Sequence, residues 1–122
     1  MNTGMNRMYP PLFSEHKPQT MRQLLCGGAN PNQEYHLGKT PLCFAESPEQ
    51  AEVLLRAGAD INGTRLTSPL HHIADPATMK YLLQHGADIN RRDQYRRTPL
   101  FTVKNRECAE LLIAAGAQIH TF

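Results

Sequence analysis

The sequence of 122 residues contains no tryptophan, and aromatic residues make up only 7% of it. Neither sign of charge dominates, because the net charge is +2 at pH 7, so no general attraction to nucleic acid or to an anionic membrane is expected. No apolar run is long enough to cross a bilayer, and residues 1–9 lack the apolar stretch of a secretory signal. These absences argue against a membrane protein and disfavour a nucleic-acid partner.

Cysteine is also scarce. Cys26, Cys43 and Cys108 are odd in number and far apart, which argues against a disulfide framework. None has a base at a spacing typical of a nucleophile, so we expect reduced thiols that fill small apolar spaces. Reduced thiols favour a cytoplasmic protein, although the sequence does not distinguish this location from that of a secreted bacterial effector.

A repeat is the main feature that the sequence does have. The string GADIN occurs at 58–62 and 86–90, with weaker copies at 28–32 and 116–120. A Pro-Leu pair precedes each copy, and its Pro always stands 17 positions before the Gly. Four copies therefore align without a gap, which indicates one structural unit used four times.

The aligned copies predict two helices in each unit. Apolar residues recur at i, i+3 and i+4, as in Ala51, Leu54 and Leu55, which is the pattern of one buried helix face. Cap residues followed in most copies by Pro mark the start of this helix, and a Gly such as Gly58 marks its end. A shorter helix, such as 40–45 or 98–103, is expected before it, with its Thr or Ser as cap.

The motifs Thr-Pro-Leu at 40–42 and 98–100, Ser-Pro-Leu-His at 68–71, Leu-Leu and Gly-Ala-Asp-Ile-Asn resemble the ankyrin repeat over nearly the whole chain. The resemblance implies an all-α solenoid of four stacked helix-turn-helix repeats with projecting loops. The repeats begin 30, 28 and 30 residues apart, whereas the ankyrin period is about 33 residues. This trimmed form is similar to the ankyrin repeats of bacterial proteins.

We expect an N-terminal tail at 1–8, a single ankyrin-repeat domain at 9–120 and a C-terminal tail at 121–122. The four repeats are placed at about 9–38, 39–66, 67–96 and 97–120. Glu15 and Gln23 stand where the other repeats have apolar residues, so the first repeat is expected to be a polar cap. At the other end we expect either that Ile119 and Phe122 fold back over the exposed face, or that self-association or a partner covers it. The chain is therefore expected to be a monomer or to self-associate weakly through this end.

Little in the sequence supports an enzyme or a metal-binding protein. His71 and His72 are adjacent and His85 is one helix away, but a metal site needs three or four converging ligands. The resemblance implies that His71 makes a structural hydrogen bond within the repeat. Glu46 and its neighbours lie along a solvated helix face. We therefore predict no catalytic residues, no metal, no cofactor and no small-molecule substrate.

The loops between repeats carry the functional prediction. We name them finger 1 (33–39), finger 2 (63–67) and finger 3 (91–97); their formal charges sum to zero, +1 and +3. Finger 3 thus concentrates positive charge, and Arg is suited to grip carboxylates. The residues predicted to bind a partner, on fingers 2 and 3 and the adjoining first helices, are Arg65, His72, Arg91, Arg92, Tyr95, Arg96, Arg97 and Lys104.

The sequence thus predicts a protein-interaction module that binds a partner protein through its loops and its concave first-helix face. An acidic patch on that partner is expected. The alternative is a regulatory or neutralising subunit, of the inhibitor or immunity type, that occludes an enzyme or a toxin. Neither the partner nor the biological process can be named from fold and charge alone.

Overall fold

The computed structural model describes residues 17–116, and within that range every regular element is a helix. The longer second helices of the repeats are α3 (Pro18–Cys26), α4 (Pro48–Arg56), α5 (Pro76–Gln84) and α7 (Arg106–Ala114). The first helices are single turns: η2 (Pro41–Phe44), η3 (Pro69–His71) and α6 (Pro99–Thr102). A further 3-10 turn, η1 (His36–Gly38), lies in finger 1. No helix in this range is long and apolar enough to span a membrane.

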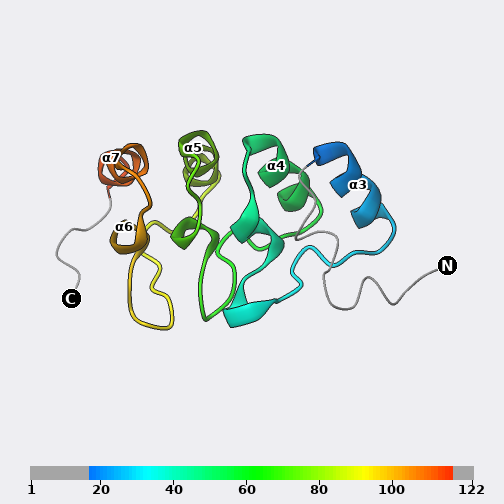
Figure 1. Cartoon of the computed structure of the whole chain (residues 1–122), viewed down its shortest axis with the longest axis horizontal. Coiled ribbons are helices and arrows are strands. Elements are labelled where there is room, and N and C mark those ends of the chain that lie inside the picture. The colour runs from blue at the N-terminus through cyan, green and yellow to red at the C-terminus, as the bar shows by residue number, and fades with distance from the viewer. Residues whose placement is uncertain (1–16, 117–122) are drawn as a thin grey trace.

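The second helices lie side by side in one row, and the fingers project from the opposite edge of the molecule (Figure 1). Each of these helices contacts the next along the chain: α3 packs on α4, α4 on α5 and α5 on α7. The expected all-α ankyrin-type stack is therefore confirmed. The first helix of the first repeat falls outside the described residues, and the domain boundaries stay a prediction.

The second helices begin where the cap residues predict. Ser47, Asp75 and Asn105 each accept the backbone N–H three residues on, at 3.2, 3.0 and 2.9 Å. The Gln50 side-chain oxygen accepts the N–H of Glu46 at 2.8 Å, one residue before the position that a capping box uses. Each cap satisfies an N–H that has no partner inside the helix.

The second helices end at glycines that the backbone requires. Gly58 has a φ of +105°, and a Cβ added to it would meet no atom within 4 Å. The left-handed backbone, rather than lack of space, therefore calls for glycine here. Its N–H donates to Leu55 O at 3.1 Å, and the N–H of Ala59 donates to Leu54 O at 3.0 Å, which closes the helix end.

The core runs along the stack as columns of equivalent residues. Leu54, Leu82 and Leu112 are completely buried, and Met79 is buried beside them. The partly buried Leu24 packs against this cluster at the N-terminal end. Because every one of these side chains lies between two neighbouring helices, no repeat buries its apolar face alone.

The first helices do not use their Thr or Ser as caps, contrary to our expectation. The N–H of Cys43 already donates to the Thr40 carbonyl at 2.9 Å, which closes the single turn through the backbone. The hydroxyl is therefore available to the side chain three residues on. Thr40 Oγ1 lies 3.8 Å from Cys43 Sγ, and Ser68 Oγ lies 2.7 Å from His71 Nδ1.

Asparagine side chains link the loops that follow the second helices. Asn32 Oδ1 accepts the N–H of Asp60 at 2.7 Å, and its amide donates to Gly58 O at 2.9 Å. Asn62 Oδ1 repeats the first of these contacts with the N–H of Asp88, at 2.8 Å. Asn32 and Asn62, the last residues of the first two strings, thus link each loop to the loop of the next repeat.

The ends of the stack differ in part from expectation. Gln23 is exposed, as a polar cap requires, whereas Glu15, Ile119 and Phe122 lie outside the described residues. Cys26 is exposed at the last position of α3, so the prediction that all three thiols fill apolar space is wrong for this one; Cys43 and Cys108 are buried. In the described part of the C-terminal repeat, the large apolar side chains of Phe101 and Ile113 are exposed.

Truncation of a core column should destabilise the whole stack. Leu54→Ala and Leu82→Ala are each expected to lower the free energy of unfolding by about 2–5 kcal/mol, because both side chains are fully buried between helices. Ile113→Ala is the matched control, since Ile113 is half exposed, and should cost less than about 1 kcal/mol. Urea unfolding measures all three variants. Equal, small losses would contradict the proposed core.

Candidate functional site

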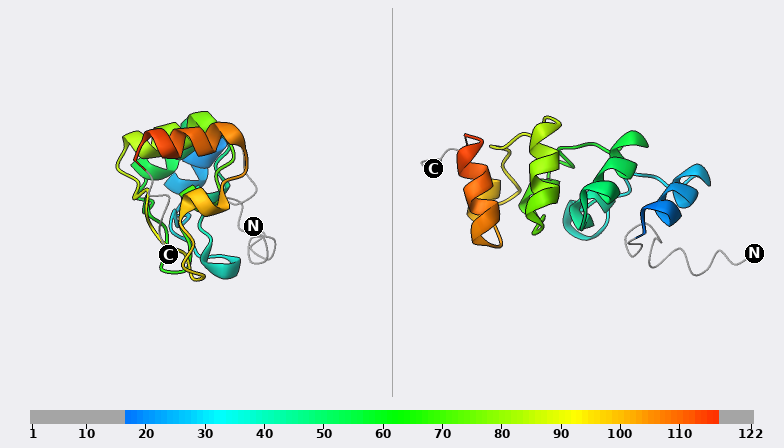
Figure 2. Two further views of the ribbon diagram at one scale, coloured as in Figure 1. Left: turned by 90° about the vertical axis from the view of Figure 1, so that its left-hand side faces the viewer. Right: turned by 90° about the horizontal axis from the view of Figure 1, so that it is seen from above.

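The three fingers form one connected edge rather than separate loops. Thr64 Oγ1 donates to Gly38 O at 2.9 Å and so joins finger 2 to finger 1. The N–H of Gln94 donates to Leu66 O at 2.8 Å, and Arg91 Nη2 donates to Thr64 O at 3.0 Å. Seen along the stack, the fingers lie together below the row of second helices (Figure 2). The edge therefore presents its side chains in a fixed arrangement.

Finger 3 is organised by the buried carboxylate of Asp93. Oδ1 accepts the N–H groups of Tyr95 and Arg97 at 2.9 and 2.8 Å, and Oδ2 accepts Arg97 Nε at 2.9 Å. Burial by itself raises the pKa of Asp93, but these hydrogen bonds and the Arg97 charge outweigh it, so the net pKa is lowered. The carboxylate stays ionised and holds the loop closed.

His71 connects finger 3 to the body of the stack. Its Nε2 lies 2.7 Å from the carbonyl oxygen of Arg97, and its Nδ1 lies 2.7 Å from Ser68 Oγ. Because a carbonyl can only accept, Nε2 carries the proton and Nδ1 accepts the hydroxyl of Ser68. Burial is the main cause that lowers the pKa of His71, in keeping with a neutral ring. The bond to Ser68 is the structural bond within the repeat that the family resemblance implies, and the bond to Arg97 reaches the start of the next repeat.

The four arginines of finger 3 fall into two groups. Arg91 and Arg97 make the contacts just described, so their side chains help to hold the finger. Arg92 and Arg96 are exposed. Arg96 has a φ of +66° and occupies the position at which finger 1 has Gly38, whose φ is +78°. This left-handed conformation costs stability when the residue is not glycine, and Arg96 adopts it at the tip of the finger.

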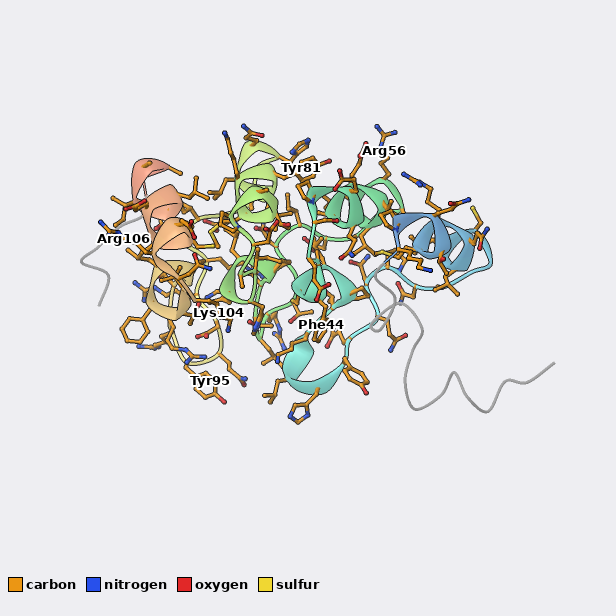
Figure 3. The ribbon with its side chains drawn as sticks, turned by 45° about the horizontal axis from the view of Figure 1, so that its top comes forward. Phe44, Arg56, Tyr81, Tyr95, Lys104 and Arg106 are labelled. Atoms are coloured by element: carbon orange, nitrogen blue, oxygen red, sulfur yellow. The ribbon has the colours of Figure 1, made fainter. Side chains whose placement is uncertain are left out.

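Tyr95 projects from the end of finger 3, with 62% of its surface exposed. The Arg97 guanidinium lies over its ring, 4.8 Å from the ring centre. Figure 3 shows Tyr95 pointing away from the helices, on the opposite side of the molecule from Arg56 and Tyr81. Asp93 therefore fixes Arg97, and Arg97 in turn supports an exposed aromatic ring.

His72 differs from the predicted arginines in its charge and in its burial. The ring is only partly exposed, with Nε2 2.8 Å from Thr67 Oγ1. Burial, and then the charges of Lys39, His71 and Lys104, lower the pKa of His72 to about 4. The ring is therefore neutral at pH 7 and adds no positive charge to the edge. It lines an open groove of about 450 Å³ between η2 and η3.

The remaining predicted residues are exposed. Arg65 lies on finger 2, beside a second open groove of about 570 Å³ that Arg91 also lines. Lys104 lies between α6 and α7, on the side of the first helices (Figure 3). The structure thus places the predicted residues along one edge, and their role in binding stays a prediction. Residues 17–116 contain no group of His, Cys, Asp and Glu able to hold a metal ion.

Sequence reasoning missed two apolar residues of this edge, Leu37 and Leu66. They are 47% and 39% exposed and lie on fingers 1 and 2. The charge pattern of the loops does not identify them, because each is a single apolar residue with no apolar residue directly beside it in the sequence. That isolation within a loop is the signal that could have identified them.

The low pKa of His72 predicts a pH-dependent stability. An unfolded chain protonates this ring near pH 6.5, whereas the folded chain does so near pH 4. The stabilisation is therefore complete above pH 6.5 and is lost as the pH falls from 6.5 to 4. His72→Gln, which can still bond Thr67, should reduce this loss by roughly 1–3 kcal/mol. Urea unfolding at pH 7.5 and 4.5 measures it; an unchanged pH dependence in the variant would contradict the assignment.

Known proteins match this chain over most of its length. A family model described as ankyrin repeats (3 copies) matches residues 12–93 and 46–122. YahD of Escherichia coli (strain K12), named as an ankyrin repeat protein, is 36% identical over 91 residues, which are 72% of this chain and 35% of that protein. The E3 ubiquitin-protein ligase Ufd4 of Drosophila melanogaster is 36% identical over 94% of this chain, but only 5% of the ligase is matched.

A smaller relative matches along most of both chains. Cyclin-dependent kinase 4 inhibitor B of Rattus norvegicus is 33% identical over 108 residues, which are 80% of this chain and 83% of the inhibitor. The chain spans about a third of the bacterial relative and a small part of the fly ligase, so their whole activities are not carried over to it. Taken with the stacked helix pairs, the family match shows that the chain belongs to the ankyrin-repeat family of protein-interaction modules.

Proposed function

We propose that the chain binds a partner protein that presents an acidic patch to fingers 2 and 3. The observation that carries this proposal is the pair of exposed arginines, Arg92 and Arg96, on a loop that Asp93 holds rigid. A preorganised guanidinium loses less entropy when it grips a carboxylate than one on a mobile loop does. Arg65 extends the positive charge onto the neighbouring finger.

The proposal assigns the chain no catalytic step. The two grooves beside the candidate residues are open to solvent, whereas catalysis generally requires a concave and water-excluding site. His72, which lines one of these grooves, bonds Thr67 and has its pKa lowered to about 4. A general base that acts at pH 7 would need a pKa close to 7.

A second candidate function is inhibition of an enzyme by occlusion. Its support is the rat cyclin-dependent kinase 4 inhibitor B, of which this chain covers 83%. An inhibitor abolishes the activity of the protein that it captures, whereas an adaptor binds without changing that activity. Assay of the captured partner with and without the chain distinguishes the two functions.

Charge reversal at the exposed arginines should weaken binding and leave the fold intact. We expect Arg92→Glu/Arg96→Glu to lower partner affinity by at least about tenfold, with a slower association rate, because rim charges steer encounter. The free energy of unfolding should change by less than about 1 kcal/mol. The partner is identified by affinity capture with mass spectrometry, and binding of the recombinant partner is measured at low and high salt.

Arg22→Glu/Lys80→Glu is the matched control, because it changes the net charge equally on the second helices α3 and α5. This control should bind as the parent chain does. Equal weakening by both double variants would indicate a general charge effect. Unchanged binding in Arg92→Glu/Arg96→Glu would move the interface away from finger 3.

Arg96→Gly should change stability and binding in opposite directions. Glycine removes the cost of the left-handed backbone at this position, so the free energy of unfolding should rise by roughly 1 kcal/mol. Binding should weaken at the same time, because the guanidinium is lost. Thermal unfolding and partner affinity are measured on the same preparation. Lower stability with unchanged affinity would assign Arg96 to the fold instead of the interface.

A further inference from the structure

The finger edge carries apolar side chains as well as charge. Leu37 on finger 1, Leu66 on finger 2 and Tyr95 on finger 3 are 47%, 39% and 62% exposed. Each finger therefore exposes at least one large apolar or aromatic side chain, and finger 1 also exposes Tyr35, at 38%. Single exposed apolar residues are ordinary on a protein surface, but these are grouped on three loops that hydrogen bonds join.

Contacts between the fingers bring the chain segments that carry these residues together. A Cβ added to Gly38 would come within 2.7 Å of Leu66 Cβ, so Leu66 lies directly against the residue that follows Leu37. On its other side the Leu66 carbonyl accepts the N–H of Gln94, the residue before Tyr95. Leu66 is thus the middle member of the row Leu37–Leu66–Tyr95.

The backbone conformation of Leu37 argues against a purely structural role for its side chain. Its φ and ψ are 59° and 31°, a left-handed conformation that glycine or asparagine adopts at lower cost. Nearly half of its side chain is nevertheless exposed to water. Folding alone would favour a smaller or polar residue at this position, and backbone strain of this kind is concentrated at ligand-binding sites.

Basic side chains accompany the row. Arg65 precedes Leu66, and Arg96 and Arg97 follow Tyr95 in the sequence. Arg65 and Arg96 are exposed, and Arg97 leaves 43% of its side chain exposed above the Tyr95 ring. Fingers 2 and 3 therefore expose positive charge beside their apolar or aromatic side chains.

We infer that the fingers bind a linear peptide segment of the partner that contains both acidic residues and large apolar ones. The inference rests on the proposed function and adds the chemistry of the segment bound. Its apolar side chains lie on Leu37, Leu66 and Tyr95, and its carboxylates meet Arg65 and the arginines of finger 3. Charge complementarity gives the attraction, and the apolar contacts give a preferred sequence.

A random peptide display library is the probe for this inference. Selection on the parent chain should enrich peptides that contain Asp or Glu together with Leu, Ile, Phe, Tyr or Trp. Leu37→Gly/Tyr95→Ser should bind the selected peptides at least about tenfold more weakly, because these substitutions remove two contacts of the row. Phe101→Ser/Ile113→Ser removes exposed apolar surface outside the fingers and should bind them as the parent does.

Circular dichroism and thermal unfolding establish that both double variants are folded. Selected peptides that are acidic but not apolar would overturn the inference and leave the proposed function standing. Peptides with neither property would contradict both. Equal binding by Leu37→Gly/Tyr95→Ser and the parent would overturn the inference. A selection that enriches no peptide would also overturn it. In that case, charge reversal measured against a folded partner still tests the proposed function separately.

Discussion

Burial of each second helix against its neighbour is the interaction on which the rest of the structure depends. Leu54, Leu82 and Leu112 are each fully excluded from water, and only an adjacent repeat can achieve this for a helix of nine residues. The same stacking brings His71 within 2.7 Å of the Arg97 carbonyl and aligns the asparagine contacts between the loops. The position of the fingers is therefore a consequence of core packing.

A stack supported in this way can carry unfavourable features at its edge. Between residues 17 and 116, the non-glycine residues with left-handed backbones are Leu37 and Arg96, and both lie on fingers. Each costs stability locally, while the helices and the Asp93 carboxylate hold the loops in place. Strain, exposed apolar surface and positive charge thus coincide on one edge. The opposite side, formed by the second helices, has surface ion pairs within single helices, such as Arg56 with Glu52.

The fold could be predicted from the sequence because the repeat makes each position recur. Ser47 and Asp75 cap their helices and Gly58 ends one, since these roles depend on a residue and its near neighbours. The site was less predictable, because it depends on contacts between loops 26 or more residues apart. Charge alone could not separate Arg97, which bonds Asp93, from Arg96, which is exposed. Nor could it show that His72 is neutral or that Leu66 lies against Gly38.

The central claim is that the stack fixes finger 3 before any partner arrives. Amide hydrogen exchange on the free chain tests this directly, because the N–H groups of Gln94, Arg96 and Arg97 all have acceptors. A preorganised finger predicts that these three amides exchange many times more slowly than in an unfolded chain. His71→Ala, which removes one of the two donors to the Arg97 carbonyl, should accelerate their exchange. Exchange of all three at the unfolded-chain rate in the parent protein would contradict the account.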